Sequence, residues 1–316
     1  MRDLVLGFDT SNYRTSVAAV TLAGQIIVNS RMLLPVKSGE RGLRQSDALY
    51  LHLKQIARIT APLREAVQDG RIVAVGASCM PRNRSDSYMP VFEVGKAVGK
   101  TIADTLNVPF FQTDHQSGHV RAAAYGTDLE NEARFMAFHL SGGTMELLKW
   151  EDGCAEILGR TLDLNAGQLV DRVGVAMGLP FPAGPELEKM ALRGTARGLL
   201  GVSMENGDLD CHLSGAESQI QRWLKDGNDP WEDLAREIYD LLARTVARML
   251  EAGRKKTGLT QALLAGGVSA SALFRQELIR RLEKHGNAVR PIFGDPELSG
   301  DNAVGVALIA ADRFRY

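Results

Sequence analysis

The chain has 316 residues, more than one core of about 150 residues usually needs, so we expect two fused lobes or two domains. Hydrophobic residues make up 45% and charged residues 24%, which is typical of a soluble globular protein and excludes a fibrous or disordered chain. The formal net charge of −1 gives no bulk positive field, so binding RNA would need a local patch or a partner.

The cysteines and the N-terminus indicate a cytoplasmic location. The three cysteines show no CxxC spacing, and their number is odd; they are Cys79, Cys154 and Cys211. This pattern fits a reducing compartment and argues against a disulfide framework. The chain turns polar after a few apolar residues, which is too short for a signal peptide, and we expect no membrane association.

Three short apolar runs open the chain and predict strands joined by tight turns, at residues 4–8, 16–22 and 25–33. The polar turn between the first two runs has two interpretations. It is a plain hairpin turn, or it faces a phosphate, with Thr10 and Ser11 offering hydroxyls and backbone N–H groups to anionic oxygens.

The next elements alternate between helix and strand. Residues 46–67 form a helical pattern in which Pro62 predicts either a kink or two helices end to end. A buried strand at 71–77 leads to a basic segment with Arg82 and Arg84, for which a solvated loop is the favoured interpretation. A helix at 92–106 and a strand at 108–112 follow.

Two histidines follow that strand with helical spacing. Thr113 and Asp114 provide a polar start, and a helix from there places His115 and His119 on one face, with Cβ atoms about 5–6 Å apart. Two imidazoles at this separation can share one transition-metal ion. The spacing alone is a weak signal, because a chance pair on a helix looks the same.

Residues 135–150 repeat the opening hairpin about 130 residues later. Ser141–Thr144 separates two apolar runs, and a third strand is expected at 155–162. Two copies of a three-strand meander, each with a polar turn, are the plan of the actin–hexokinase–Hsp70 (ASKHA) nucleotide-binding fold, an α/β fold of two duplicated lobes. In that fold the two turns hold the phosphates of ATP.

The remaining chain predicts further helices and strands. Helices are expected at 165–178, 186–192, 231–256, 269–283 and 299–311, and strands at 261–264 and 289–293. Residues 195–228 are glycine-rich with weak periodicity, and we interpret them as an insertion or a mobile region. Gly266 and Gly267 form a turn that a nucleotide can approach closely. Asp301 and Asn302 are expected in the first turn of the last helix, where an acid can simply serve the helix dipole.

Five segments, in the right order, resemble motifs of the TsaD family, the tRNA threonylcarbamoyladenosine transferases also labelled O-sialoglycoprotein endopeptidases. The family's HMEGH corresponds to residues 115–119 and its VSGGHT to 140–144; AAGEAFDK with GLxYPGGP corresponds to 165–172 with 178–185, AGGVSAN to 265–271, and TDN to 300–302. The resemblance runs along nearly the whole chain. It implies a first lobe of residues 1–125 plus 300–316, and a second lobe of 126–299 carrying the insertion near 195–228.

The resemblance implies that His115, His119 and Asp301 hold one divalent metal ion, iron in relatives, with zinc as the alternative. Three ligands leave positions open for water or substrate. Because Asp301 follows His119 by 182 residues, we expect the lobes to close around an ion lying between them.

A nucleotide site is also implied, for ATP, ADP or an acyl-adenylate, with Mg²⁺ as a further cofactor. The residues expected to form it are His139, Leu140, Ser141, Gly142, Gly143, Asp171, Gly184, Gly266, Gly267 and Ser271. Ser141–Gly143 would face the phosphates or the carbamoyl-adenylate, Asp171 and Gly184 the ribose, and the two later glycines the base. No side chain stands out as a covalent nucleophile or catalytic base.

The chain departs from the family in the first lobe and near the acceptor. The family's ETSCDET becomes residues 9–15, with Tyr13 and Arg14 replacing acids, and its AxGPGLxGxL loop becomes residues 78–84. Its FSGLKT loses the lysine at residues 213–218, and Ser271 replaces an asparagine. These departures are typical of a divergent paralogue.

Three functions therefore stay open. The first is metal-dependent transfer of threonylcarbamoyl from its adenylate to adenine of tRNA, together with TsaB-like and TsaE-like proteins or a second copy of the chain. The second is carbamoyl transfer to another acceptor. The third is a nucleotide-binding partner subunit without catalysis, against which the three potential metal ligands argue.

Overall fold

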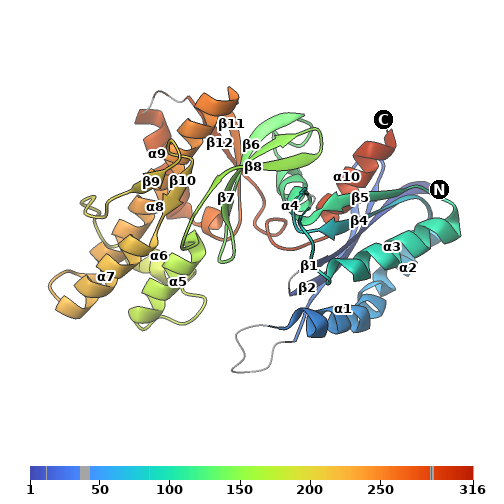
Figure 1. Ribbon diagram of the computed structural model, residues 1–316, viewed down its shortest axis with the longest axis horizontal. Coiled ribbons are helices and arrows are strands. Elements are labelled where there is room, and N and C mark those ends of the chain that lie inside the picture. Colours follow the sequence, from blue (N-terminus) through green and yellow to red (C-terminus); the bar gives the residue numbers. More distant parts are fainter. Residues whose placement is uncertain (12, 36–42, 85, 285, 287, 316) are drawn as a thin grey trace. The chain divides into compact units, whose positions relative to one another are not determined.

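Two five-stranded sheets with matching strand order form the framework of the protein (Figure 1). The computed structural model describes residues 1–11, 13–35, 43–84, 86–284, 286 and 288–315. Unit 1 comprises Met1–Tyr125, Gly153–Ala155 and Glu297–Tyr316, and unit 2 comprises Gly126–Asp152 and Glu156–Pro296. Each unit has its own sheet and core.

The sheet of unit 1 has the order β3-β2-β1-β4-β5. Its strands are β1 (Arg2–Ser11), β2 (Arg14–Thr21), β3 (Ile26–Leu33), β4 (Gly70–Met80) and β5 (Phe110–Asp114). β1 pairs antiparallel with β2 and parallel with β4. The helices are α1 (Gln45–Ile59), α2 (Ala61–Gln68), α3 (Phe92–Leu106), α4 (His115–Ala124) and α10 (Val304–Arg315).

Alternation along β1 sends side chains to two separate cores. Leu6 and Phe8 join a cluster with residues of α1, α2 and α3, whereas Val5 joins a cluster with α10. Both clusters are buried, so the sheet is covered on both faces, as a parallel centre requires. The polar residues at the end of β1 and the start of α4 are thus fixed by a rigid frame.

The sheet of unit 2 has the order β12-β11-β6-β7-β8, which repeats the order of unit 1. Its strands are β6 (Arg134–Leu140), β7 (Met145–Glu151), β8 (Cys154–Arg160, starting in unit 1), β11 (Gln261–Ala265) and β12 (Arg290–Phe293). β6 pairs antiparallel with β7 and parallel with β11. The duplicated α/β plan predicted from sequence is confirmed.

The helices of unit 2 share one large core. They are α5 (Ala166–Ala176), α6 (Gly184–Ala191), α7 (Ser214–Asp226), α8 (Trp231–Thr257) and α9 (Ala272–Lys284), with a 3₁₀ turn at Val268–Ala270. α8 carries an apolar face that is buried along most of its length, including Ile238, Leu242 and Val246. Among the described residues, no helix combines the length and apolarity needed to cross a bilayer.

The structure decides one open alternative and differs from the prediction at two other places. Residues 46–67 form two helices, α1 and α2, which meet at Thr60, so the end-to-end alternative holds. Residues 195–228, interpreted as an insertion or a mobile region with no predicted helix or strand, contain α7 and a two-stranded ribbon of β9 (Ser203–Glu205) and β10 (Asp210–His212). Leu200, Cys211 and Ile220 from this segment lie in the unit 2 core. The second difference, at Asp301, concerns the candidate site.

Candidate metal centre

The start of α4 places both histidines. Asp114 caps the helix, because its Oδ1 accepts the Ser117 N–H at 2.8 Å and its Oδ2 accepts the Ser117 hydroxyl at 2.6 Å. The helix therefore begins at His115, and His119 lies one turn later on the same face. Burial raises the pKa of Asp114 against the hydrogen bonds from Ser117.

Asp301 reaches this helix from a loop. It precedes α10, which begins at Val304, so the prediction that Asp301 lies in the first helical turn is wrong. The side chain of Asn302 explains the difference: it accepts the Val304 N–H at 2.9 Å and donates to the carbonyls of Leu298 and Gly300. Asn302 thus closes the turn before the helix, and the Asp301 carboxylate is left to serve the site.

Close packing of α10 on α4 brings the carboxylate to the histidines. A Cβ at Gly305 would lie 1.8 Å from the Gly118 carbonyl oxygen, so only glycine permits this approach. All three candidate ligands lie in unit 1. The expectation that two lobes must close to assemble them is wrong, because α10 and the loop before it lie in unit 1 and α10 packs against α4.

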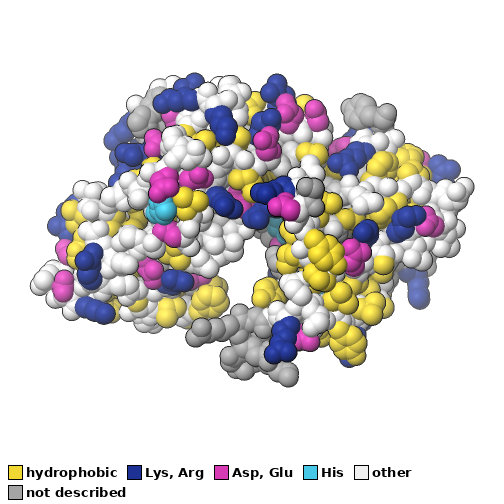
Figure 2. All heavy atoms as spheres, viewed as in Figure 1, with side chains coloured by type: hydrophobic (Ala, Val, Ile, Leu, Met, Phe, Trp, Pro, Cys, Tyr) yellow, Lys and Arg dark blue, Asp and Glu magenta, His cyan; other side chains and the backbone are white. Residues whose placement is uncertain are grey.

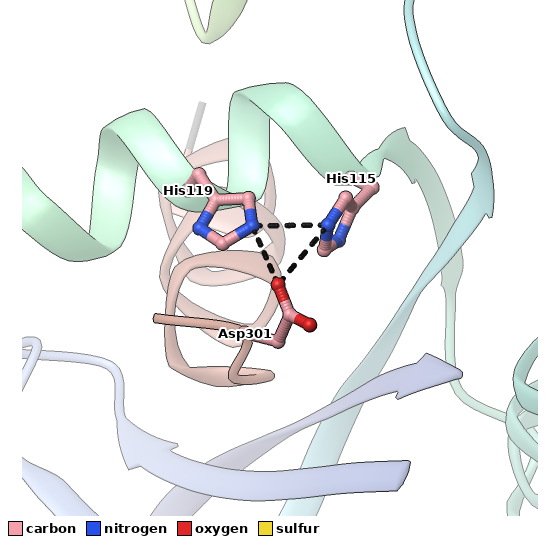
Figure 3. Close-up of side chains that lie close together, drawn as sticks. All are labelled: His115, His119 and Asp301. Carbon is pink, nitrogen blue, oxygen red and sulfur yellow. Dashed lines mark hydrogen bonds and ion pairs between the residues drawn. The ribbon is translucent and has the colours of Figure 1, made fainter. Parts of the chain in front are cut away.

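The three side chains converge on one point (Figure 3). His115 Nε2 and His119 Nε2 are 2.9 Å apart, and Asp301 Oδ1 lies 3.0 Å from His119 Nε2 and 3.6 Å from His115 Nε2. Such mutual separations suit three donors on one face of a single ion, because metal–ligand bonds are about 2.0–2.2 Å long. Two imidazoles and one carboxylate form the donor set of non-haem Fe²⁺ sites and of three-ligand zinc sites.

Asp9 is a residue of this centre that the sequence did not indicate. Its carboxylate is fully buried, and Oδ1 lies 3.0 Å from His115 Nδ1. The hydroxyls of Ser11 and Ser78 also donate to it. A carboxylate at Nδ1 holds that nitrogen protonated and turns the Nε2 lone pair toward the centre. Only the position of Asp9 at the end of a buried strand could have identified it.

Electrostatics in the metal-free protein favour an imidazolium. Burial by itself lowers the pKa of His115, but the Asp9 charge and hydrogen bonds to Asp301 and Asp9 raise it to about 10. Burial likewise opposes ionisation of Asp301, but hydrogen bonds from His115 and His119 hold its pKa well below the usual range. A cation at this point can replace the proton, so the site has the charge a metal ion requires.

The hydroxyls of Thr10 and Ser11, expected to face a phosphate, are engaged inside unit 1. Thr10 Oγ1 donates to the Val91 carbonyl at 2.8 Å and accepts the Gly95 N–H at 3.1 Å, while Ser11 Oγ donates to Asp9. Both residues belong to β1, and both are fully buried. Because both hydroxyls are engaged, phosphate binding by Thr10 and Ser11 stays a prediction for their backbone N–H groups only.

Six of the residues expected to contact a nucleotide lie together around the end of β6 in unit 2: His139, Leu140, Ser141, Gly142, Gly143 and Gly266. β11 runs beside β6, with Ala265 opposite His139. Gly266 has φ +99°, and a Cβ there would lie 2.2 Å from the Leu140 carbonyl oxygen. Ser141 Oγ accepts the N–H of Thr144, and Gly142 is exposed. The turn thus presents backbone unobstructed by side chains.

The other expected contacts of unit 2 have structural partners. Asp171 accepts the Ala183 N–H at 2.8 Å, and the Gly184 carbonyl accepts the Tyr239 hydroxyl at 3.1 Å. Ser271 Oγ caps α9 by accepting the Phe274 N–H at 3.1 Å. Gly267 is open, with nothing within 4 Å of a Cβ placed on it. Their role in nucleotide binding stays a prediction.

A basic residue, Arg14, replaces a family acid near the candidate metal centre. Arg14 Nη1 lies 3.4 Å from the carbonyl oxygen of Asp301. The loop after β4 also reaches α4, because the Pro81 carbonyl accepts the Gln116 N–H at 3.2 Å. Arg84 in that loop is exposed and paired with Asp86. Of these arginines, Arg14 is the one that contacts the loop carrying Asp301.

Comparisons with known proteins identify the family and the fold. The tRNA N6-adenosine threonylcarbamoyltransferase of Oenococcus oeni is 31% identical over 324 residues, covering 98% of this chain and 91% of that protein. Among solved structures, T. kodakarensis HypF aligns with a TM-score of 0.64 at 14% identity, covering 99% of this chain and 48% of that chain. The ROK hexokinase of Thermus thermophilus aligns with a TM-score of 0.53 at 16% identity, covering 99% of each chain.

The two structural similarities confirm the ASKHA fold and, at these identities, nothing finer. The family is established separately, by a sequence profile described as "TsaD: tRNA N6-adenosine threonylcarbamoyltransferase", which matches residues 89–308. This region includes both histidines, the glycine turns and Asp301. The chain therefore belongs to the TsaD family of transferase enzymes.

Proposed function

We propose that this chain transfers a threonylcarbamoyl group from its adenylate to N6 of an adenine in tRNA. The convergence of His115, His119 and Asp301 within one unit carries the proposal. In the reaction, the adenine amine attacks the carbamoyl carbon and a C–N bond forms. The bond from that carbon to the phosphate oxygen breaks, AMP leaves with the electron pair, and the amine loses a proton to water.

The residues of unit 1 would hold the metal and set its ligands. His115 and His119 supply Nε2 donors and Asp301 supplies Oδ1, while Asp9 holds the His115 ring in the required tautomer. Iron is the first choice from the donor set and zinc the second. A divalent ion bound there would act as a Lewis acid toward a carbonyl oxygen.

The residues of unit 2 would bind the nucleotide part. In the turn after β6, the N–H groups of Ser141 and Gly143 donate to the Thr144 carbonyl and to Ser141 Oγ, so the N–H of exposed Gly142 is the group offered to a phosphate oxygen. The turn at Gly266 and Gly267 would leave room for the base. Asp171 and Gly184 are assigned to the ribose. We include TsaB-like and TsaE-like subunits as partners, since the net charge of −1 indicates shared RNA binding.

Complementation tests the proposal. The gene is expressed in cells depleted of their own threonylcarbamoyltransferase, and modified adenosine in tRNA is measured by mass spectrometry. We expect modification with the wild-type chain and loss with Asp301→Ala. Absence of modification with a folded, metal-loaded protein and matched partner subunits would refute the tRNA role.

Carbamoyl transfer to a different acceptor is a second candidate, favoured by the contact of Arg14 with the Asp301 carbonyl. A guanidinium beside the metal ligands attracts an anionic group, whereas the family carries an acid there. Purified protein would be offered carbamoyl-adenylate and threonylcarbamoyl-adenylate, and release of AMP would be measured. Turnover of the threonylcarbamoyl form alone would exclude this candidate.

A further inference from the structure

A groove of about 310 Å³ lies in unit 2 along the C-terminal halves of α8 and α9, apart from the glycine turns. Its charged lining residues are Arg244, Arg248, Glu251 and Lys255 of α8, Arg281 of α9, and Asp208. Four are basic and two acidic, in a chain whose net charge is −1. Figure 2 shows Lys and Arg side chains gathered over the ends of these helices.

The base of the groove is a preorganised pair of guanidinium groups. Asp240 is 4% exposed and accepts from Arg244 Nε at 2.8 Å and from Arg281 Nη2. Arg244 Nη2 also donates to the Leu200 carbonyl at 2.7 Å. Two cations share one carboxylate, so one positive charge is left over. Because the two guanidinium groups are already held in place, a ligand that binds them would cost less side-chain entropy.

One donor at the base is unsatisfied. Arg281 Nε is buried and has no hydrogen-bond partner among the described residues. A buried donor without a partner is destabilising, and such a group needs an explanation. An anion or water drawn into the groove by a small shift of the Arg281 side chain would satisfy it.

The rim adds Arg248 and Lys255, both exposed. They lie seven residues apart on α8, a rise of about 10 Å along the helix. Compensation of the helix dipole explains Lys255 in the last turn of α8. It does not explain Arg248, which lies more than two turns before Thr257.

We propose that this groove binds phosphate groups of the tRNA backbone. The inference rests on the proposed tRNA substrate, and it locates one part of the RNA contact on α8 and α9. As a backbone contact it would position the RNA and carry no sequence information. It supplies the local basic patch that the neutral net charge requires.

The test compares two neutralised pairs in the full-length chain. Arg248→Gln with Lys255→Gln removes the rim charges, and Arg222→Gln with Lys225→Gln makes the same charge change on α7, also in unit 2. Binding of fluorescent unmodified tRNA is measured by anisotropy between about 50 and 200 mM salt. Urea unfolding curves verify that both variants fold like the wild type.

We expect the groove pair to bind tRNA about 10-fold more weakly at low salt, and its log–log salt slope to fall by about 1.5. The α7 pair should keep both quantities. Equal losses in the two pairs, no loss in either, or no tRNA binding by the wild type would each overturn the proposal. Tight binding of inorganic pyrophosphate that depends on the groove, with unchanged tRNA affinity, would also overturn it.

A transfer assay separates this inference from the proposed function. With active wild-type protein, the groove pair should raise KM for tRNA about 10-fold and leave kcat unchanged. Wild-type protein that binds tRNA through the groove but transfers nothing would refute the proposed reaction and keep the groove. Full activity of the groove pair with unchanged KM would refute the groove alone.

Discussion

The ends of β1 and β6 occupy equivalent places in two sheets of the same order, yet they present opposite surfaces. In unit 1 the side chains of Asp9, Thr10 and Ser11 are fully buried and bonded to neighbours. In unit 2 Gly142 and Gly143 are exposed, and nothing lies within 4 Å of a Cβ placed on either. One strand end supports a candidate metal ligand, and the other presents glycine backbone.

The two units therefore share the order of their strands, but the residues at the strand ends differ in burial and in chemistry. Both strands have the same neighbours, an antiparallel partner on one side and a parallel partner on the other, because the core depends on them. Residues that follow the last buried apolar position of each strand do not contribute to the core, so they can differ between the two units. Asp9 continues the β1 ladder to Ser11, whereas the β6 ladder stops at Leu140 and a glycine turn begins.

Removing a metal ligand is expected to have the largest effect. His119→Ala deletes one of three donors, so metal affinity should fall by more than about 100-fold, beyond the 10–100-fold typical of outer-shell residues. Metal content by elemental analysis and affinity by chelator competition measure it. Ser141→Ala, at the strand end of unit 2, should retain full metal content; a comparable loss in that variant would break the comparison.

Gly266→Ala should be the most destabilising change near the β6 strand end. Its Cβ would lie 2.2 Å from the Leu140 carbonyl oxygen at φ +99°, so we expect unfolding free energy to fall by about 3 kcal/mol. Gly267→Ala is the control, because it has helical φ and open space, and should cost less than about 1 kcal/mol. Equal effects in urea unfolding would contradict the close approach of β11 to β6.

Asp9→Asn tests whether the buried end of β1 orients a ligand. An amide cannot accept from Ser11, Ser78 and His115 as the carboxylate does, so the His115 ring loses its fixed tautomer. Metal affinity should fall about 10–100-fold. Asp312→Asn is the matched control, since Asp312 pairs with Arg121 of the same helix α4 without touching the histidines. Unchanged metal affinity in Asp9→Asn would remove Asp9 from the centre.

The last expected effect is a pH dependence confined to unit 1. The folded pKa of His115, about 10, exceeds its ordinary value of 6.5. Its contribution to the stability of metal-free protein is therefore complete below pH 6.5 and is lost as pH rises through 10. Urea unfolding in chelator should show the wild type losing its advantage over His115→Gln across this window. A constant difference would mean that His115 stays neutral; the cost of Gly266→Ala should not vary with pH.

The spacing of apolar residues predicted most helices and strands, because that spacing reflects which side chains are buried in each element. The helix predicted at 92–106 has those bounds, and α8 ends one residue beyond the prediction. No helix was predicted in segment 195–228, because α7 is fixed from a distance. Asp163 accepts the N–H groups of Leu213 and Ser214 from 50 and 51 residues away. No pattern within the segment can show such a cap.

The amino-acid sequence by itself determined the two-lobed plan, the family and the identity of the three candidate ligands, since these depend on local periodicity and on motifs in order. Tertiary structure decided which groups meet. Asp9 approaches His115 across 106 residues of chain, and Asp301 approaches His119 across 182. Contacts at that range are set by sheet order and by the Gly305–Gly118 packing of α10 on α4, which no neighbouring residue encodes.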